Sequence, residues 1–104
     1  MRQFTCVITP TNLKFGTISL PAEFADLFPS GGKIAEILVH FDGSETTSPL
    51  RYQSQYRTLS GLKEWYKVRK ANADDKLSFI QLKRGEFTVA LIPKRRDRFK
   101  PNED

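Results

Sequence analysis

Short segments in which apolar and polar residues alternate recur along the chain, and this alternation constrains the fold most. Phe4, Cys6 and Ile8 share one face of a first segment, and Ile18 and Leu20 share one face of a second. A period of two is typical of half-buried strands, because successive side chains of a strand point to opposite faces. The sequence therefore predicts a mainly β domain.

More strands are predicted downstream. They cover residues 34–41, 49–53, 77–82 and 87–92. The run Ile34–Phe41 is rich in Ile, Val and Leu, which indicates a central strand, whereas the segment at 49–53 is weaker and is expected to resume near Tyr56. The last two segments flank Lys83-Arg84-Gly85-Glu86, so we expect a hairpin whose turn takes a positive φ at Gly85.

Two short helices interrupt the strands. The first is predicted over Pro21–Phe28, with Pro at the first helical position, and the second over Leu62–Lys70, with Asn72 as a left-handed cap. Leu62, Trp65 and Tyr66 form the buried stripe of the second helix, and lysines line its opposite face. The expected fold is a mostly antiparallel β-sheet with the two helices closing the ends of a small barrel or sandwich.

The length and the cysteine count bound the class of protein. With 104 residues the chain has room for one domain. We expect that domain to span residues 1–93, followed by a basic and then acidic tail or linker at residues 94–104. One cysteine and one histidine supply neither a disulfide nor four zinc ligands. No run approaches the roughly 20 apolar residues of a membrane span, and the N-terminus lacks the pattern of a secretory signal. We expect no cofactor, metal or membrane partner.

Positive charge is concentrated in the second half of the chain. Residues 1–50 carry three basic and five acidic side chains, whereas residues 51–100 carry fourteen and five. Such an imbalance favours a polyanion partner, and nucleic acid is one such partner. The alternative is that these side chains only keep one face soluble.

Three motifs, in order, resemble the B-three family of DNA-binding pseudobarrels. Ile18–Ala25 is similar to that family's strand-Leu-Pro-x-x-Phe-Ala segment, Leu59–Tyr66 to its helix start, and Asn72–Phe79 to its exit into a strand. The resemblance spans roughly residues 4–92 and implies an open, antiparallel pseudobarrel. Among its branches, the brevity of the chain favours the N-terminal effector domain of EcoRII-like restriction endonucleases over the plant transcription-factor domains.

The resemblance implies that two loop arms grip the major groove of double-stranded DNA. The first arm maps to Thr9–Gly16 and the second to Arg51–Thr58, and neither contains an acidic residue. Arg matches guanine, Gln and Asn match adenine, and hydroxyls bind phosphates or either edge. The predicted contact residues, including a basic run after the last strand, are Thr11, Asn12, Lys14, Arg51, Gln53, Ser54, Gln55, Tyr56, Arg57, Lys94, Arg95 and Arg96.

Other residues are expected to be structural. His40 lies in the central strand without a nearby metal-ligating partner, and Cys6 alternates with apolar neighbours. Asp74-Asp75-Lys76 superficially offers carboxylates and a lysine for a metal-dependent nuclease, but adjacent strand residues point to opposite faces, so a loop-to-strand transition is the simpler reading. We therefore predict no catalytic site in this domain.

The expected function is sequence-specific DNA recognition by a monomer, with cleavage in a restriction enzyme supplied by a covalently linked or separate nuclease domain. Localisation would then be the bacterial cytoplasm, or the nucleus for a plant-like transcription-factor domain. Two other classes stay open. One is a single-stranded nucleic-acid-binding barrel that stacks bases on Tyr52, Tyr56 and Phe15, and the other is a basic protein adaptor.

Overall fold

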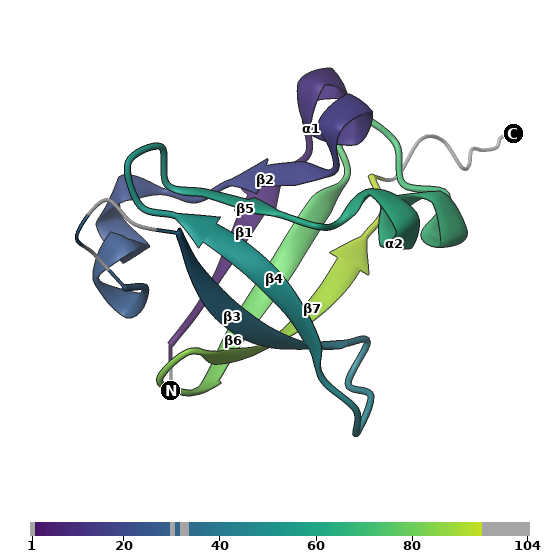
Figure 1. The fold of residues 1–104 in the computed structure, drawn as a ribbon. Coiled ribbons are helices and arrows are strands. Elements are labelled where there is room, and N and C mark those ends of the chain that lie inside the picture. The colour runs from purple at the N-terminus through teal and green to yellow at the C-terminus, as the bar shows by residue number, and fades with distance from the viewer. Residues whose placement is uncertain (1, 30, 32–33, 95–104) are drawn as a thin grey trace, which may run out of the picture.

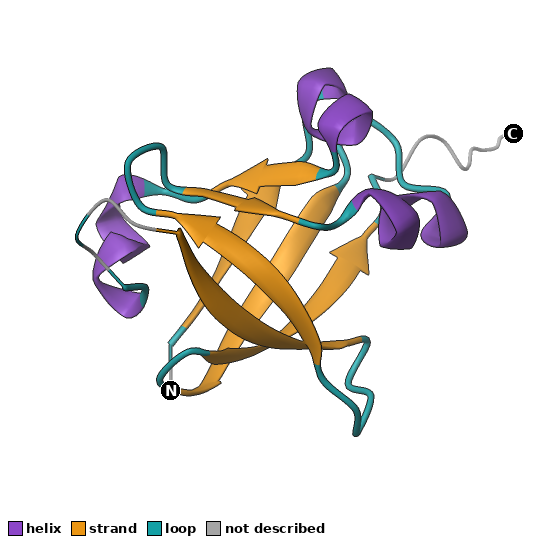
Figure 2. Ribbon diagram, viewed as in Figure 1, coloured by secondary structure: helices purple, strands orange, loops and turns teal. Residues whose placement is uncertain are grey.

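The computed structural model describes residues 2–29, 31 and 34–94, and this part of the chain holds seven strands and three short helices (Figure 2). The strands are β1 (Gln3–Val7), β2 (Thr17–Ser19), β3 (Ile34–Phe41), β4 (Ser48–Gln53), β5 (Thr58–Ser60), β6 (Lys76–Lys83) and β7 (Glu86–Ile92). The helices are α1 (Pro10–Phe15), the 3₁₀ helix η1 (Ala22–Leu27) and α2 (Lys63–Arg69).

All seven strands belong to one sheet in the order β1-β6-β7-β3-β4-β5-β2, which puts β3 at its centre as predicted. The two edge strands, β1 and β2, also contact one another, so the sheet curls into a nearly closed barrel (Figure 1). The prediction of a mainly β pseudobarrel is thereby confirmed.

The sheet is mixed, because one parallel pair occurs within the mostly antiparallel arrangement that was expected. β3 and β7 pair in parallel, with Leu38 opposite Glu86 and Phe41 opposite Val89, while the other pairs are antiparallel. A parallel pair needs a long crossover connection, which here runs through β4, β5, α2 and β6. Parallel and antiparallel half-buried strands share the same alternation, so the sequence pattern could not distinguish them.

The inward faces of the strands build one aromatic-rich core. The Phe4 ring stacks on Phe79 with centroids 5.0 Å apart, and the Phe28 ring stacks on Phe87 at 4.7 Å. Phe28 follows η1 directly and reaches into one end of the barrel, whereas α2 lies at the opposite end (Figure 2). Burying rings of this size supplies much of the hydrophobic stabilisation of so small a domain.

The helices differ from the prediction in two ways. The segment after Pro21 forms a 3₁₀ helix in which Pro21 occupies the N-cap and not the first helical position, and Phe28 is its C-cap. A third helix, α1, occupies the stretch that was expected to be a polar loop. The signal that was missed is a capping box between Thr9 and Asn12, where the more usual third-position residue is Glu or Gln.

The turns around α2 and β6 complete the comparison. α2 falls within the predicted range, but its left-handed cap is Lys70, with φ of 56°, and not Asn72. Gly85 takes φ of 76° in the turn between β6 and β7, as expected. Of the two aspartates before β6, Asp75 has a structural use, since its buried side chain accepts backbone N–H bonds from Asn72 and Lys94 at 2.9 and 2.8 Å.

Candidate nucleic-acid interface

The first arm, Thr9–Gly16, is a rigid helical turn. The Thr9 side-chain oxygen accepts the Asn12 N–H at 3.1 Å, and the Asn12 Oδ1 accepts the Thr9 N–H at 2.9 Å. The Asn12 Nδ2 donates to the Thr17 Oγ1 at 3.1 Å, which ties α1 to β2. Asn12 is only 5 % exposed, so the structure gives this predicted contact residue a structural role and leaves its amide no free edge for a base.

Gly16 fixes the arm against the rest of the domain. It caps α1 in the left-handed region with φ of 69°, and its carbonyl accepts the Leu62 N–H at 2.9 Å. A Cβ at this position would lie 2.5 Å from the Lys63 backbone N, a distance at which side chains are not tolerated. The Tyr66 hydroxyl adds a bond of 2.7 Å to the Thr17 carbonyl, so α1, β2 and α2 meet at one rigid junction.

The second arm is shorter than predicted, because part of Arg51–Thr58 belongs to strands. β4 extends to Gln53 and β5 begins at Thr58, so the arm is the turn Ser54–Arg57. The Tyr56 N–H donates to the Gln53 carbonyl at 3.2 Å, and the Arg57 carbonyl accepts the Leu20 N–H at 2.8 Å. The turn is thus anchored to the residue that follows β2.

The two arms stand at opposite ends of the same short strand pair. β2 and β5 are antiparallel, with Thr17 opposite Ser60 and Ser19 opposite Thr58. The first arm ends at Gly16 and the second is bonded at Leu20, which is four residue steps away, or about 13 Å along an extended strand. Figure 1 shows α1 and the β4–β5 turn on the same side of the molecule, with β2 and β5 running between them.

Small polar side chains cover the outer face between the arms. Ile18 and Leu59 point into the core, and the residues beside them in β2 and β5 therefore point outward. We name this surface the hydroxyl strip, and it consists of Thr17, Ser19, Thr58 and Ser60. The predicted contact set omitted these four residues, because pairing between positions 17 and 60 cannot be read from local alternation.

The remaining predicted contact residues are distributed unevenly. Six are exposed and two are half-buried at the end of β4 and the start of the turn. The exposed ones are Thr11, Lys14, Arg51, Gln55, Tyr56 and Arg57, and the half-buried ones are Gln53 and Ser54. Lys94 lies beside the aspartates before β6, with its Nζ 3.8 Å from an Asp74 oxygen, and the predicted contacts Arg95 and Arg96 lie outside the described residues.

Tyr52 is a core residue and not a surface aromatic. It is 2 % exposed, and its ring lies 4.9 Å from that of Phe28. It alternates with the exposed Arg51 along β4, so the strand pattern already contained the signal. The stacking surface of the single-stranded alternative thereby loses one of its three aromatics.

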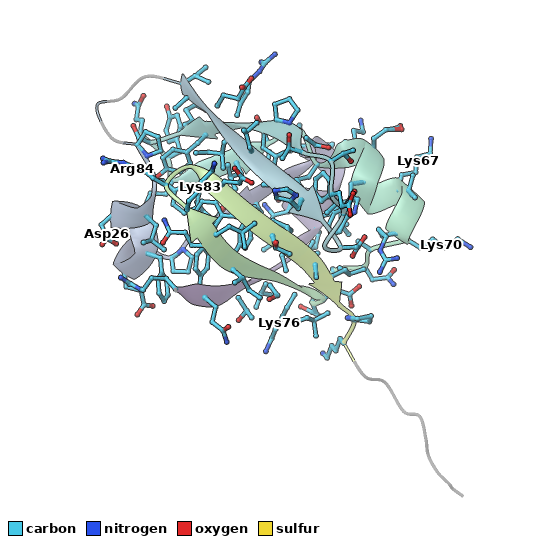
Figure 3. The ribbon with its side chains drawn as sticks, turned by 90° about the horizontal axis from the view of Figure 1, so that it is seen from below. Asp26, Lys67, Lys70, Lys76, Lys83 and Arg84 are labelled. Atoms are coloured by element: carbon cyan, nitrogen blue, oxygen red, sulfur yellow. The ribbon has the colours of Figure 1, made fainter. Side chains whose placement is uncertain are left out.

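Charged side chains also lie outside the two arms. Lys67 and Lys70 project from α2, whereas Lys83 and Arg84 lie at the opposite end of the domain, near Asp26 of η1 (Figure 3). No cluster of three or more His, Cys, Asp or Glu side chains suited to a metal ion occurs within residues 2–29, 31 and 34–94. The helices of that same part of the chain are too short and too polar to cross a bilayer.

The titratable groups with shifted pKa values belong to the scaffold. The His40 Nε2 lies 2.5 Å from a Glu86 oxygen, and its Nδ1 lies 2.7 Å from the Ser44 carbonyl oxygen. The hydrogen bond to Glu86 raises the pKa of His40 and lowers the pKa of Glu86. Burial raises the pKa of the Cys6 thiol to about 12. None of these three residues lies in either arm, which agrees with the structural roles expected for His40 and Cys6.

Comparisons with known proteins identify structural relatives. No protein-family model matches the sequence, and no curated protein matches it. The N-terminal domain of Helicobacter pylori LlaJI.R1 superposes with a TM-score of 0.67 at 16% identity, over 88% of this chain and 81% of that one. The hypothetical Arabidopsis thaliana protein At1g16640.1 superposes with a TM-score of 0.66 at 17% identity, over 88% and 90% of the two chains. At such identities these likenesses establish a shared fold.

Proposed function

We propose that this chain, whose fold is the DNA-binding pseudobarrel of the B-three type, recognises a short sequence in double-stranded DNA. In this proposal the first arm, Thr9–Gly16, and the turn Ser54–Arg57 enter the major groove together. The hydroxyl strip between them faces the base edges.

The spacing of the arms carries the proposal. About 13 Å of extended strand separates their attachment points, and the major groove of B-DNA is about 12 Å wide. Neither Thr9–Gly16 nor Arg51–Thr58 contains a carboxylate that would repel phosphates. Two polar arms that leave one rigid strand pair at this distance fit the two sides of one groove.

The exposed side chains of the arms divide into those that would contact base edges and those that would contact phosphates. Arg57 and Gln55 are exposed on the second arm. The paired N–H donors of Arg suit guanine, and the amide donor and acceptor of Gln suit adenine. Thr11 and Lys14 are exposed on the first arm and suit phosphate oxygens, which set orientation without reading sequence. Arg51 lies opposite Glu36 in the β3–β4 register, so we assign it a weaker contribution.

We further propose that the chain acts as the recognition module of a restriction enzyme and that cleavage belongs to another domain or chain. This step rests on the sequence motifs that resemble the B-three pseudobarrels, among which the brevity of the chain favours the EcoRII-like branch. Incubating the purified chain with duplex DNA and Mg²⁺ should leave the DNA intact, and strand cleavage that tracks the chain through purification would contradict the assignment.

Selection of bound molecules from a random duplex pool tests recognition, with a random single-stranded pool as the control. The proposal predicts that one duplex motif is enriched and that its affinity falls steeply as salt rises, because phosphate contacts release counterions. Sedimentation of the complex should show one copy of the chain per site. Enrichment from the single-stranded pool alone, or from neither pool, would refute duplex reading.

A further inference from the structure

Phe15 is a large apolar side chain that the fold leaves in solvent at the end of the first arm. It is 62 % exposed, although the adjacent Gly16 is buried. The Lys14 Nζ lies 5.5 Å from the centre of its ring. The ring therefore contributes little to the core. It lies on the arm that we propose enters the DNA groove.

The direction of Phe15 follows from the helix that carries it. Leu13 lines a pocket between α1 and α2 together with Tyr66 and Lys67. Each residue of a helix is rotated by about 100°, so Phe15 lies about 200° from Leu13 and faces away from α2. Figure 1 shows α2 on one side of α1 and the β2–β5 pair running away on the other, so the face of α1 opposite α2 is the one toward the strand pair that carries the hydroxyl strip.

The neighbours of Phe15 on α1 support this direction. Thr11 is four residues earlier and therefore occupies the same helix face. Thr11, Lys14 and Phe15 are exposed, while Asn12 and Leu13 turn toward the domain. Two groups suited to phosphate thus flank one apolar ring on the outward face of the arm.

The major groove offers a phenylalanine ring few apolar partners. Base edges there carry hydrogen-bond donors and acceptors, and the one apolar group of the standard bases is the C5-methyl of thymine. A ring held against polar edges would lose hydration without gaining a partner. We propose that Phe15 contacts a pyrimidine C5-methyl group at one end of the recognised site, an inference that rests on the proposed duplex reading.

Thymine and 5-methylcytosine present the same methyl group in the groove, so the test has two arms. In the first, each thymine of the selected duplex is replaced in turn by uracil, which removes only the methyl. In the second, each cytosine is replaced in turn by 5-methylcytosine, which adds it. The chain, Phe15→Ala and Val68→Ala are compared, since Val68 is an apolar residue of α2 that is 73 % exposed and outside both arms.

The proposal expects one position at which the methyl strengthens binding of the unaltered chain by about fourfold, the value of one buried methyl-sized group. Phe15→Ala should lose this preference and retain the fold in thermal unfolding, while Val68→Ala should keep the preference. A methyl preference that survives in Phe15→Ala, or its absence at every thymine and cytosine, overturns the assignment while leaving duplex reading intact. Failure to enrich any duplex overturns both.

Discussion

Replacing Gly16 with alanine tests whether the first arm is held rigidly against α2. Gly16 has φ of 69°, and a Cβ there would meet three atoms of Lys63 at 2.5, 2.6 and 2.8 Å. Two of those atoms are backbone atoms of the first residue of α2, which cannot swing aside as a side-chain end can. The substitution therefore adds both backbone strain and a steric clash.

The two costs can be estimated separately. An alanine held in the left-handed region costs about 1–2 kcal/mol, and overpacking in a dense junction costs about 1–3 kcal/mol. The free energy of unfolding should fall by about 2–5 kcal/mol, a large share of the roughly 5–15 kcal/mol typical of a whole domain. Gly85→Ala is the matched control, because Gly85 has φ of 76° but nothing within 4 Å of its Cβ position.

Denaturant titration of the two variants isolates the clash. Gly85→Ala should lose about 1–2 kcal/mol from strain alone. Gly16→Ala should lose about 1–3 kcal/mol more, with the same dependence on denaturant concentration. Equal losses in the two variants would refute the reasoning, since they would mean that α1 moves away from α2 without cost and that the first arm is not fixed.

Three further predictions concern the core, the pH dependence and the second arm. Phe28→Ala should lower the free energy of unfolding by about 3–5 kcal/mol because Phe28 is 5 % exposed. Phe24→Ala should lower it clearly less, because Phe24 is only half-buried. Glu86 raises the pKa of His40 above 6.5, so, while Glu86 is ionised, the stabilisation from this contact is complete below pH 6.5 and is lost as the pH rises through the raised pKa of His40. His40→Gln should flatten this decline in denaturant titrations across pH. Arg57→Ala should cost about 1–3 kcal/mol on the selected duplex and relax base preference at one position.

Each of these has a result that would count against it. Equal losses at the two phenylalanines would show that η1 does not direct Phe28 into the barrel. A pH profile that is the same with and without His40 would remove the imidazole from the stability of the sheet. Unchanged affinity together with unchanged base preference in Arg57→Ala would take Arg57 out of the recognition surface.

The strands were predictable because each has one buried face. β3 was placed at the centre from its run of branched and aliphatic residues, and the β6–β7 turn was placed from Gly85. Local alternation shows which face of a strand is buried, but it does not show which other strand that strand pairs with. The parallel pairing of β3 with β7 and the approach of β1 to β2 join distant parts of the chain, so they could not be predicted.

The first arm shows a different limit. α1 has six residues, too few for an apolar period to be recognised. Its capping residue Asn12 is of a type that is also common in ordinary turns. Asn12 was therefore predicted to contact DNA, whereas the structure uses its side chain to close the helix and to bond Thr17. Polar residues that complete a cap and polar residues that face a ligand look alike in a sequence.

In the second arm, the alternation of inward and outward side chains continues from β4 into a segment that is mostly polar. Arg51–Thr58 was expected to be one arm, yet Tyr52 continues the inward face that Leu50 begins. The arm itself starts only where the period ends, at Ser54. The hydroxyl strip depends on β2 meeting β5 across forty residues of sequence, and only the structure brings it together.

Amide chemical-shift changes in the isotopically labelled chain, recorded as the selected duplex is added, test the central claim most directly. That claim is that both arms engage the same groove from the two ends of the β2–β5 pair. We predict the largest changes within residues 9–16 and 54–57, with smaller changes along β2 and β5 and none at the β6–β7 turn. Changes confined to one arm, or centred on Lys83–Glu86, would contradict it.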